Sequence, residues 1–127
     1  MKNIFLYSLI VILVGCTGSP VWHGLKMNQT AKEAEINNRK MMRIEIGQMK
    51  EEVLKIMGFP AKREAYQLEN NNIVEFLFFR TQGWSQEDGG DADHQFTPVA
   101  IQNGKVMGWG RNFYDKVVRT SVEIIRK

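Results

Sequence analysis

Cysteine and histidine are scarce in this chain of 127 residues. Cys16 is the only cysteine, so the chain cannot form an internal disulfide. The two histidines, His23 and His94, have no serine or cysteine partner in a recognisable catalytic motif. A glycine-rich phosphate loop ahead of a predicted helix is also missing. We therefore expect neither enzymatic activity nor a cofactor.

The chain also lacks a strong excess of positive or negative charge. The 17 lysines and arginines are nearly balanced by 14 aspartates and glutamates, which gives a formal net charge of +3. A surplus this small does not indicate binding to nucleic acid. Proline occurs three times, and neither a repeat nor a low-complexity segment is present. The length suits a single small domain.

The N-terminus carries an apolar run over residues 4–14, preceded by Lys2. The run is too short to span a bilayer comfortably and has the proportions of a secretory signal. It ends in Leu13-Val14-Gly15-Cys16, which resembles a bacterial lipobox. That resemblance implies that residues 1–15 are a signal peptide and that Cys16 is acylated. The alternative is an ordinary signal peptide or a membrane anchor, in which Cys16 is incidental.

The residue after the lipobox cysteine points to a compartment. Thr17 follows Cys16, and no aspartate does. By resemblance to proteobacterial lipoproteins, this favours a lipid-anchored protein of the outer membrane that faces the periplasm. Residues 16–27 are expected to form a tether, because Gly18-Ser19-Pro20 interrupts regular structure. Residues 28–127 then form one domain.

Two helices are predicted ahead of any strand. Thr30 and Glu33 have the spacing of a capping box, so a first helix should begin near Thr30 and run to about Met42. A second, amphipathic helix is predicted between Gly47 and Gly58, since apolar residues recur there at i, i+4, i+7 and i+8. These residues are Met49, Val53, Ile56 and Met57. Pro60 prevents the helix from continuing.

The second helix also carries a family resemblance. Gly47, Val53 and Gly58-Phe59-Pro60 have the spacing of the signature of small outer-membrane lipoproteins of the SmpA/OmlA (BamE-like) type. Gln48 and Met49 depart from that signature, and Met49 replaces a capping serine or threonine. The resemblance implies helices packed on an antiparallel sheet, and a role in outer-membrane protein assembly or envelope integrity.

The sequence after Pro60 changes to a period of two. Strands are predicted over residues 61–68, 73–80, 96–102 and 105–109, with the Asn103-Gly104 hairpin turn joining the last two. In the second strand Val74, Phe76 and Phe78 face one way and Leu77 and Phe79 the other, which suggests a central strand. Gly108 leaves room for the close approach of another segment.

Together these elements predict an α+β fold. Two N-terminal helices should pack on one face of a three- to four-stranded antiparallel sheet, in two layers. We expect Val53 of the second helix and Phe76 of the second strand to share one core. Residues 111–127 mix β-branched and charged side chains, and predict neither a helix nor a strand.

The long connection over residues 81–95 is the candidate for metal binding. Its acidic residues and histidine are Glu87, Asp88, Asp91, Asp93 and His94. Oxygen ligands in a loop that contains glycine suit calcium, but the spacing is not that of a calcium-binding loop and no closing glutamate follows. We therefore read the connection as a solvated loop and assign no metal ligand.

Aromatic and basic residues around this loop suggest a binding surface. Tryptophan, tyrosine and arginine are the residue types that dominate interface energetics. The predicted partner-binding residues are Arg80, Trp84, Trp109, Arg111 and Tyr114. The alternative is that Trp109 and Phe113 belong to the core and only Tyr114 and Arg111 face solvent, because a small domain needs several large apolar groups in its core.

Two classes of function follow from these features. The first is a lipid-anchored, periplasm-facing interaction module that binds other envelope proteins or lipid headgroups. The second is a small-ligand or ion-binding lipoprotein that uses residues 81–95. Inhibition of a periplasmic enzyme is a further alternative, implied by analogy of fold.

Overall fold

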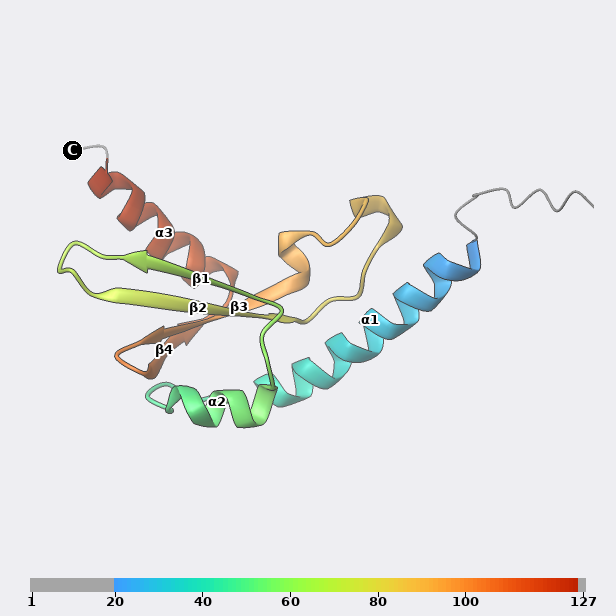
Figure 1. The fold of residues 1–127 in the computed structure, drawn as a ribbon, viewed down its shortest axis with the longest axis horizontal. Coiled ribbons are helices and arrows are strands. Elements are labelled where there is room, and N and C mark those ends of the chain that lie inside the picture. Colours follow the sequence, from blue (N-terminus) through green and yellow to red (C-terminus); the bar gives the residue numbers. More distant parts are fainter. Residues whose placement is uncertain (1–19, 126–127) are drawn as a thin grey trace, which may run out of the picture.

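The computed structural model describes residues 20–125, so Cys16 and the lipobox-like motif lie outside the described residues. The elements in this part are α1 (Pro20–Met41), α2 (Lys50–Met57), β1 (Lys62–Gln67), β2 (Ile73–Arg80), β3 (Phe96–Gln102), β4 (Lys105–Trp109) and α3 (Arg111–Ile125) (Figure 1). Two short 3-10 helices, η1 (Gln86–Asp88) and η2 (Asp93–Gln95), lie between β2 and β3. Across these residues, no helix combines the length and hydropathy that crossing a bilayer requires.

The four strands form one antiparallel sheet in the order β1-β2-β3-β4, so each strand pairs with its neighbour in sequence. β2 is an inner strand, and its Phe76 lies opposite Glu64 of β1 and Ala100 of β3. The β3–β4 hairpin turns at Asn103 and Gly104, whose φ angles of 52° and 75° fit a type I′ turn. The predicted strands and the Asn-Gly hairpin are confirmed.

One face of the sheet packs against α2 and the end of α1. Val53 and Met57 of α2 are buried against Leu77 and Phe79 of β2. Ile44, from the connection between the two helices, completes the contact. A helix as short as α2 is not stable alone in water, and this packing stabilises it by burying its apolar face. Lys50 of α2 pairs with Glu75, which interrupts that face of β2, at 2.8 Å.

The opposite face of the sheet packs against α3. Phe113, Tyr114 and Val117 of α3 lie against a cluster made by β2 and β3. The buried members of that cluster are Val74, Phe76, Phe78 and Ala100. Figure 1 shows α3 above the sheet and α2 below it. The α+β class is confirmed, and α3, for which the sequence predicted no element, adds a third layer.

The two layers of helices divide the core into two halves. Val53 and Phe76 are both fully buried, but Val53 belongs to the α2 face of the sheet and Phe76 to the α3 face. The prediction that they share one core is therefore wrong, because a third helix provides Phe76 with a separate partner. Gly108 permits this packing, since a Cβ there would lie 2.8 Å from the Phe113 ring.

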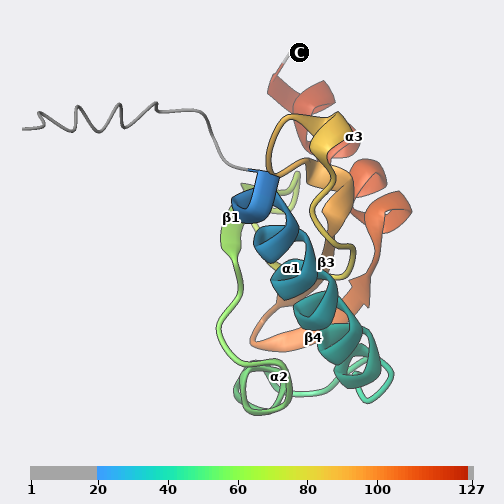
Figure 2. The same ribbon diagram turned by 90° about the vertical axis from the view of Figure 1, so that its right-hand side faces the viewer.

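α1 begins earlier than predicted. Residues 20–27, expected to form a tether, are its first turns. Pro20 stands at the first position, where its fixed φ and missing N–H are tolerated. Thr30 lies inside the helix and does not cap it, and its hydroxyl donates to the Lys26 carbonyl at 2.9 Å. Figure 2 shows α1 crossing the molecule at an angle, with α2 beside its end.

Candidate functional site

Arg80, at the end of β2, is almost fully buried, with 6% of its surface exposed. Its guanidinium donates to Gln95 Oε1 at 2.8 Å and to Asp91 Oδ1 at 2.7 Å. It also lies 4.5 Å from the centre of the Phe96 ring. Because these internal partners occupy the guanidinium, we assign Arg80 a structural role, which corrects the predicted partner-binding one.

Gln95 is the buried centre of the connection from β2 to β3, and its surface is wholly inaccessible. Its side-chain amide donates to Asp88 Oδ2 at 2.8 Å and to the Gly90 carbonyl at 3.3 Å. Its backbone carbonyl accepts from the N–H groups of Thr81 and Gln82. Residues 81–95 are thus folded around one glutamine, a residue that no motif in the sequence singled out.

The carboxylates of this connection contact different partners. Asp88 accepts from Gln95 and lies 3.3 Å from His94 Nε2. Asp91 pairs with Arg80, and Asp93 with Lys62 of β1 at 2.8 Å. No three acidic or histidine side chains in the described chain are placed to hold a metal ion.

Trp84 joins the connection to α1. Its ring lies edge-on to that of His23, with centroids 5.6 Å apart, and 5.2 Å from the Lys26 ammonium. Its backbone N–H donates to the Thr30 hydroxyl at 2.8 Å. Its indole Nε1 is buried without a hydrogen-bond partner among the described residues. Trp84 is therefore half-buried, and it packs the connection between β2 and β3 against α1.

Tyr114 joins α3 to the edge strand β1. Its hydroxyl donates to Glu64 Oε2, and Tyr66 donates to the same oxygen at 2.8 Å. Burial of the Glu64 carboxyl would raise its pKa, but these two hydrogen bonds and the nearby Lys62 outweigh it and hold the pKa below its usual value. Burial and the bond to Glu64 raise the pKa of Tyr114, so this phenol stays a donor.

Lys62 links this cluster to the connection between β2 and β3. The hydrogen bond to Asp93 holds the pKa of Lys62 above its usual value, although burial opposes it. The same bond lowers the pKa of Asp93. Both groups therefore remain charged near neutral pH.

Arg111 and Trp109 complete the five predicted binding residues. Arg111 donates to the carbonyls of Asp93 and Phe96, and its guanidinium lies 5.2 Å from the Tyr114 ring. Trp109, on the edge strand β4, is exposed over 39% of its surface. Arg80, Arg111 and Tyr114 thus each make hydrogen bonds inside the molecule, whereas Trp109 is exposed.

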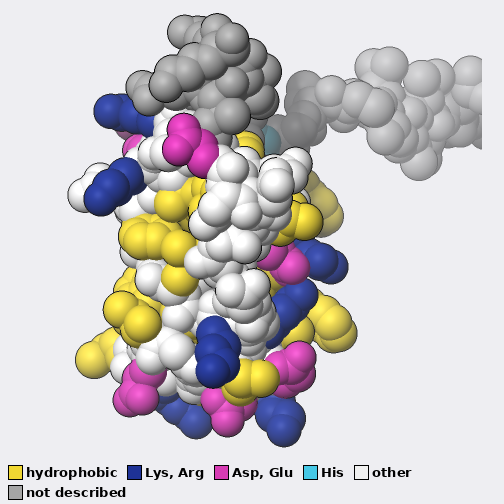
Figure 3. Space-filling model, turned by 90° about the vertical axis from the view of Figure 1, so that its left-hand side faces the viewer, with side chains coloured by type: hydrophobic (Ala, Val, Ile, Leu, Met, Phe, Trp, Pro, Cys, Tyr) yellow, Lys and Arg dark blue, Asp and Glu magenta, His cyan; other side chains and the backbone are white. Residues whose placement is uncertain are grey.

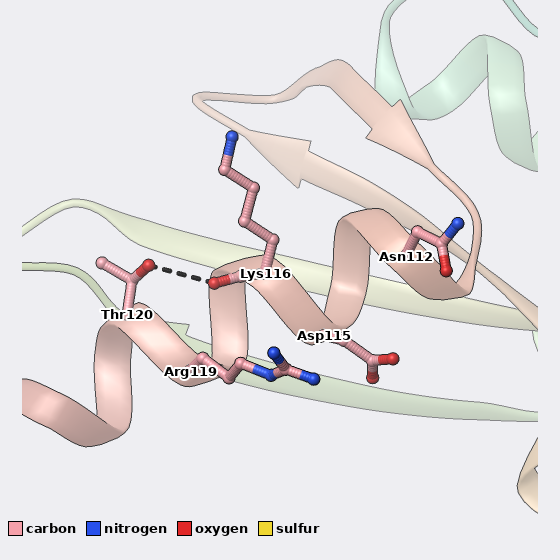
Figure 4. A pocket seen from close by; sticks show the side chains of 5 residues that line it. All are labelled: Asn112, Asp115, Lys116, Arg119 and Thr120. Carbon is pink, nitrogen blue, oxygen red and sulfur yellow. Dashed lines mark hydrogen bonds between the residues drawn. The ribbon is translucent and has the colours of Figure 1, made fainter.

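A shallow hollow of about 390 Å³ runs along α3 (Figure 4). It is lined by Asn112, Asp115, Lys116, Arg119 and Thr120. Figure 4 shows Lys116 extending away from Asp115 and Arg119. These side chains do not converge on one point, so the hollow presents no arranged set of ligand-binding groups.

Phe59 is the most exposed large apolar side chain of the described chain, at 97%. It follows α2, where Gly58 has a φ of +83° and donates its N–H to the Leu54 carbonyl at 2.8 Å. Pro60 fixes the backbone on the other side, and the Ala61 N–H then donates to the Phe78 carbonyl. A short, restrained connection therefore holds an aromatic ring in solvent.

Other exposed apolar side chains lie on the connection that precedes α2. Met42 and Ile46 are both largely exposed, although the Gly47 N–H beside them is tied to the Val106 carbonyl at 2.8 Å. At the end that carries the two hairpins, Figure 3 shows hydrophobic side chains interspersed with charged ones. Phe59 was missed as a candidate because Gly58-Phe59-Pro60 was interpreted as a helix stop and as part of the family signature, neither of which assigns a role to the ring.

Comparison with known proteins gives one match. The family model described as "Protein of unknown function (DUF3192)" matches residues 11–116. No curated protein and no solved structure matches the chain.

Proposed function

Because the chain belongs to the DUF3192 family of proteins of unknown function, we propose its function from its own residues. The protein is a lipid-anchored interaction module of the bacterial cell envelope, which faces the periplasm from the outer membrane and binds another envelope protein.

The observation that carries this proposal is the exposed ring of Phe59. A large aromatic side chain in water is unfavourable, and its transfer into a partner's pocket is worth roughly 1.5–3 kcal/mol. The N–H groups of Gly58 and Ala61, on either side of Phe59, are bonded to the Leu54 and Phe78 carbonyls, and the ring of Pro60 fixes its φ. Little backbone freedom is therefore lost on binding. Aromatic anchors of this kind are common interface hot spots.

The N-terminal sequence supports the envelope location. Leu13-Val14-Gly15-Cys16 resembles a lipobox, and a lipid anchor would confine the domain to one membrane. Confinement raises the effective concentration of the domain for its neighbours, so a modest affinity is sufficient. The resemblance to SmpA/OmlA lipoproteins makes outer-membrane protein assembly the expected context.

The alternative of ion or small-ligand binding by residues 81–95 has less support. Asp88, Asp91 and Asp93 already contact Gln95, Arg80 and Lys62, respectively. A ligand that used these carboxylates would have to break the contacts that fold the connection.

The proposal is tested by a crosslinking pull-down from intact cells. Phe59→Ala is compared with the wild type and with Ile73→Ala, which removes another exposed apolar side chain at the distant β1–β2 hairpin. We expect Phe59→Ala to reduce recovery of the partner by about tenfold or more, as the loss of 1.4 kcal/mol or more implies. Equal recovery with both variants, at equal protein levels, contradicts the proposal.

A further inference from the structure

The first turns of α1 carry an apolar face that points away from the domain. Trp22, Leu25 and Gln29 stand at i, i+3 and i+7 and so share one side of the helix. Trp22 is 69% exposed, and Val21 and Leu25 are also exposed. Trp22, Leu25 and Gln29 line a hollow of about 470 Å³ on the helix surface, and Lys26 and Thr30 form its edge on the side that faces the domain.

The other side of the same turns packs on the domain. His23 and Lys26 contact the Trp84 ring, and Thr30 accepts from the Trp84 backbone. Further along, Asn37 donates to the Arg80 carbonyl at 2.8 Å. α1 is therefore held in a fixed orientation, and its apolar face keeps one direction. Figure 1 shows the start of α1, in blue, lying beyond the sheet.

The expected lipid anchor lies close to this face. Three residues separate Cys16 from Pro20, and four extended residue steps reach at most about 14 Å. Trp22 lies two residues further on, which adds roughly 3 Å along a helix. An acylated Cys16 sits at the membrane surface. The start of α1 therefore lies at most about 14 Å from that surface, a distance of the same order as the thickness of the headgroup region.

The chemistry of the segment suits a lipid surface. Tryptophan is enriched at the interface between lipid and water, and apolar side chains on one side of a helix insert shallowly there. No aspartate or glutamate precedes Glu33, whereas Lys26 and Lys32 do. An anionic headgroup therefore meets no carboxylate along this part of the helix.

We propose that the outward face of α1, formed by Val21, Trp22 and Leu25, lies in the headgroup region of the membrane that holds the anchor. This proposal rests on the lipid anchor of the proposed function. The contact makes α1 a second attachment point beside the acyl chains, and so fixes how the domain is oriented on the membrane.

The experiment places the purified, full-length membrane form in phosphatidylcholine vesicles that contain some phosphatidylglycerol. Tryptophan fluorescence is recorded with bromine-labelled lipid chains as one quencher and aqueous iodide as the other. The wild type is compared with Trp22→Phe and with Trp109→Phe, a control for an exposed tryptophan on the edge strand β4. Both changes are at exposed sites, and circular dichroism checks that each variant is folded.

We expect lipid quenching in the wild type, the same quenching in Trp109→Phe, and loss of most of it in Trp22→Phe. Iodide quenching that depends on Trp22 overturns the proposal, because the face then remains in water. A Trp22 signal that neither quencher reaches also overturns it, because a second copy of the chain then covers the face.

The mass of the mature protein separates this inference from the proposed function. An acylated Cys16 together with a Trp22 that lipid does not quench refutes the α1 contact and leaves the anchor standing. A mass without acyl chains refutes the anchor and, with it, the α1 contact.

Discussion

The Tyr114 hydroxyl of α3 donates a hydrogen bond to the Glu64 carboxylate of β1. The Tyr66 hydroxyl lies 3.0 Å from that of Tyr114 and donates to the same carboxylate oxygen. One partly buried charge thus connects the C-terminal helix to the edge strand, next to the aromatic cluster of Phe76 and Phe78.

Tyr114→Phe should destabilise the fold in a pH-dependent way. The folded-state pKa of Glu64 lies below its usual value of 4.5, so its contribution is present above about that pH and is lost as the pH falls through the lowered value. We expect a loss of about 1.5 kcal/mol at pH 7, typical of a hydrogen bond to a charged group. Denaturant unfolding at several pH values measures it. A loss that stays the same at acid pH would show that Glu64 is not the partner.

Gln95→Leu should unfold the connection between β2 and β3. The change removes the hydrogen bond from the Arg80 guanidinium to Gln95 and the hydrogen bond from Gln95 to the Asp88 carboxylate. Arg80 is buried, and the loss of a hydrogen-bond partner by a buried polar group costs about 1–3 kcal/mol, and more when the group is charged. Gln86→Leu, on the exposed surface of the same connection, is the matched control. Equal unfolding free energies for the two variants would rule out this role for Gln95.

The two halves of the core should behave independently. Val53→Ala and Phe76→Leu affect opposite faces of the sheet, so their effects on the free energy of unfolding should add to within about 0.5 kcal/mol. Val53→Ala with Leu77→Ala, in one cluster, should show a larger coupling energy. A strong coupling between Val53 and Phe76 in denaturant melts would contradict the division.

Cys16→Ala should release the protein from the membrane fraction. The replacement removes the thiol that acylation requires, and the α1 face by itself binds lipid reversibly. Cell fractionation followed by mass measurement of the mature chain tests this. A variant that stays fully in the membrane with an unchanged mature mass would show that Cys16 is not the anchor.

Most of the sheet could be predicted from the sequence, because its signals are local. Alternation in residues 73–80 identified β2, and Asn103-Gly104 fixed the register of the last hairpin. α3 was missed because Val117, Val118 and Thr120 favour strands locally, and packing overrides that preference. The spacing of Phe113 and Val117 at i and i+4 was the signal for a helix.

The candidate site was harder to predict because it depends on which polar groups pair in space. Arg80 and Tyr114 have the residue types of a binding surface, yet they are used inside the molecule. Their partners, Gln95 and Glu64, lie 15 and 50 residues away along the chain, so no local pattern reveals them. Phe59 is exposed because no helix or strand within residues 20–125 covers its connection, which only the fold can show.

Photo-crosslinking in living cells tests whether the exposed ring of Phe59 contacts an envelope protein. A photoreactive phenylalanine analogue is placed at position 59 in the full-length protein, and at position 73 as a control on the distant hairpin. We expect one dominant crosslinked envelope protein from position 59 and much less of it from position 73. Illumination that yields no crosslinked protein from position 59, or equal yields from both positions, would contradict this expectation.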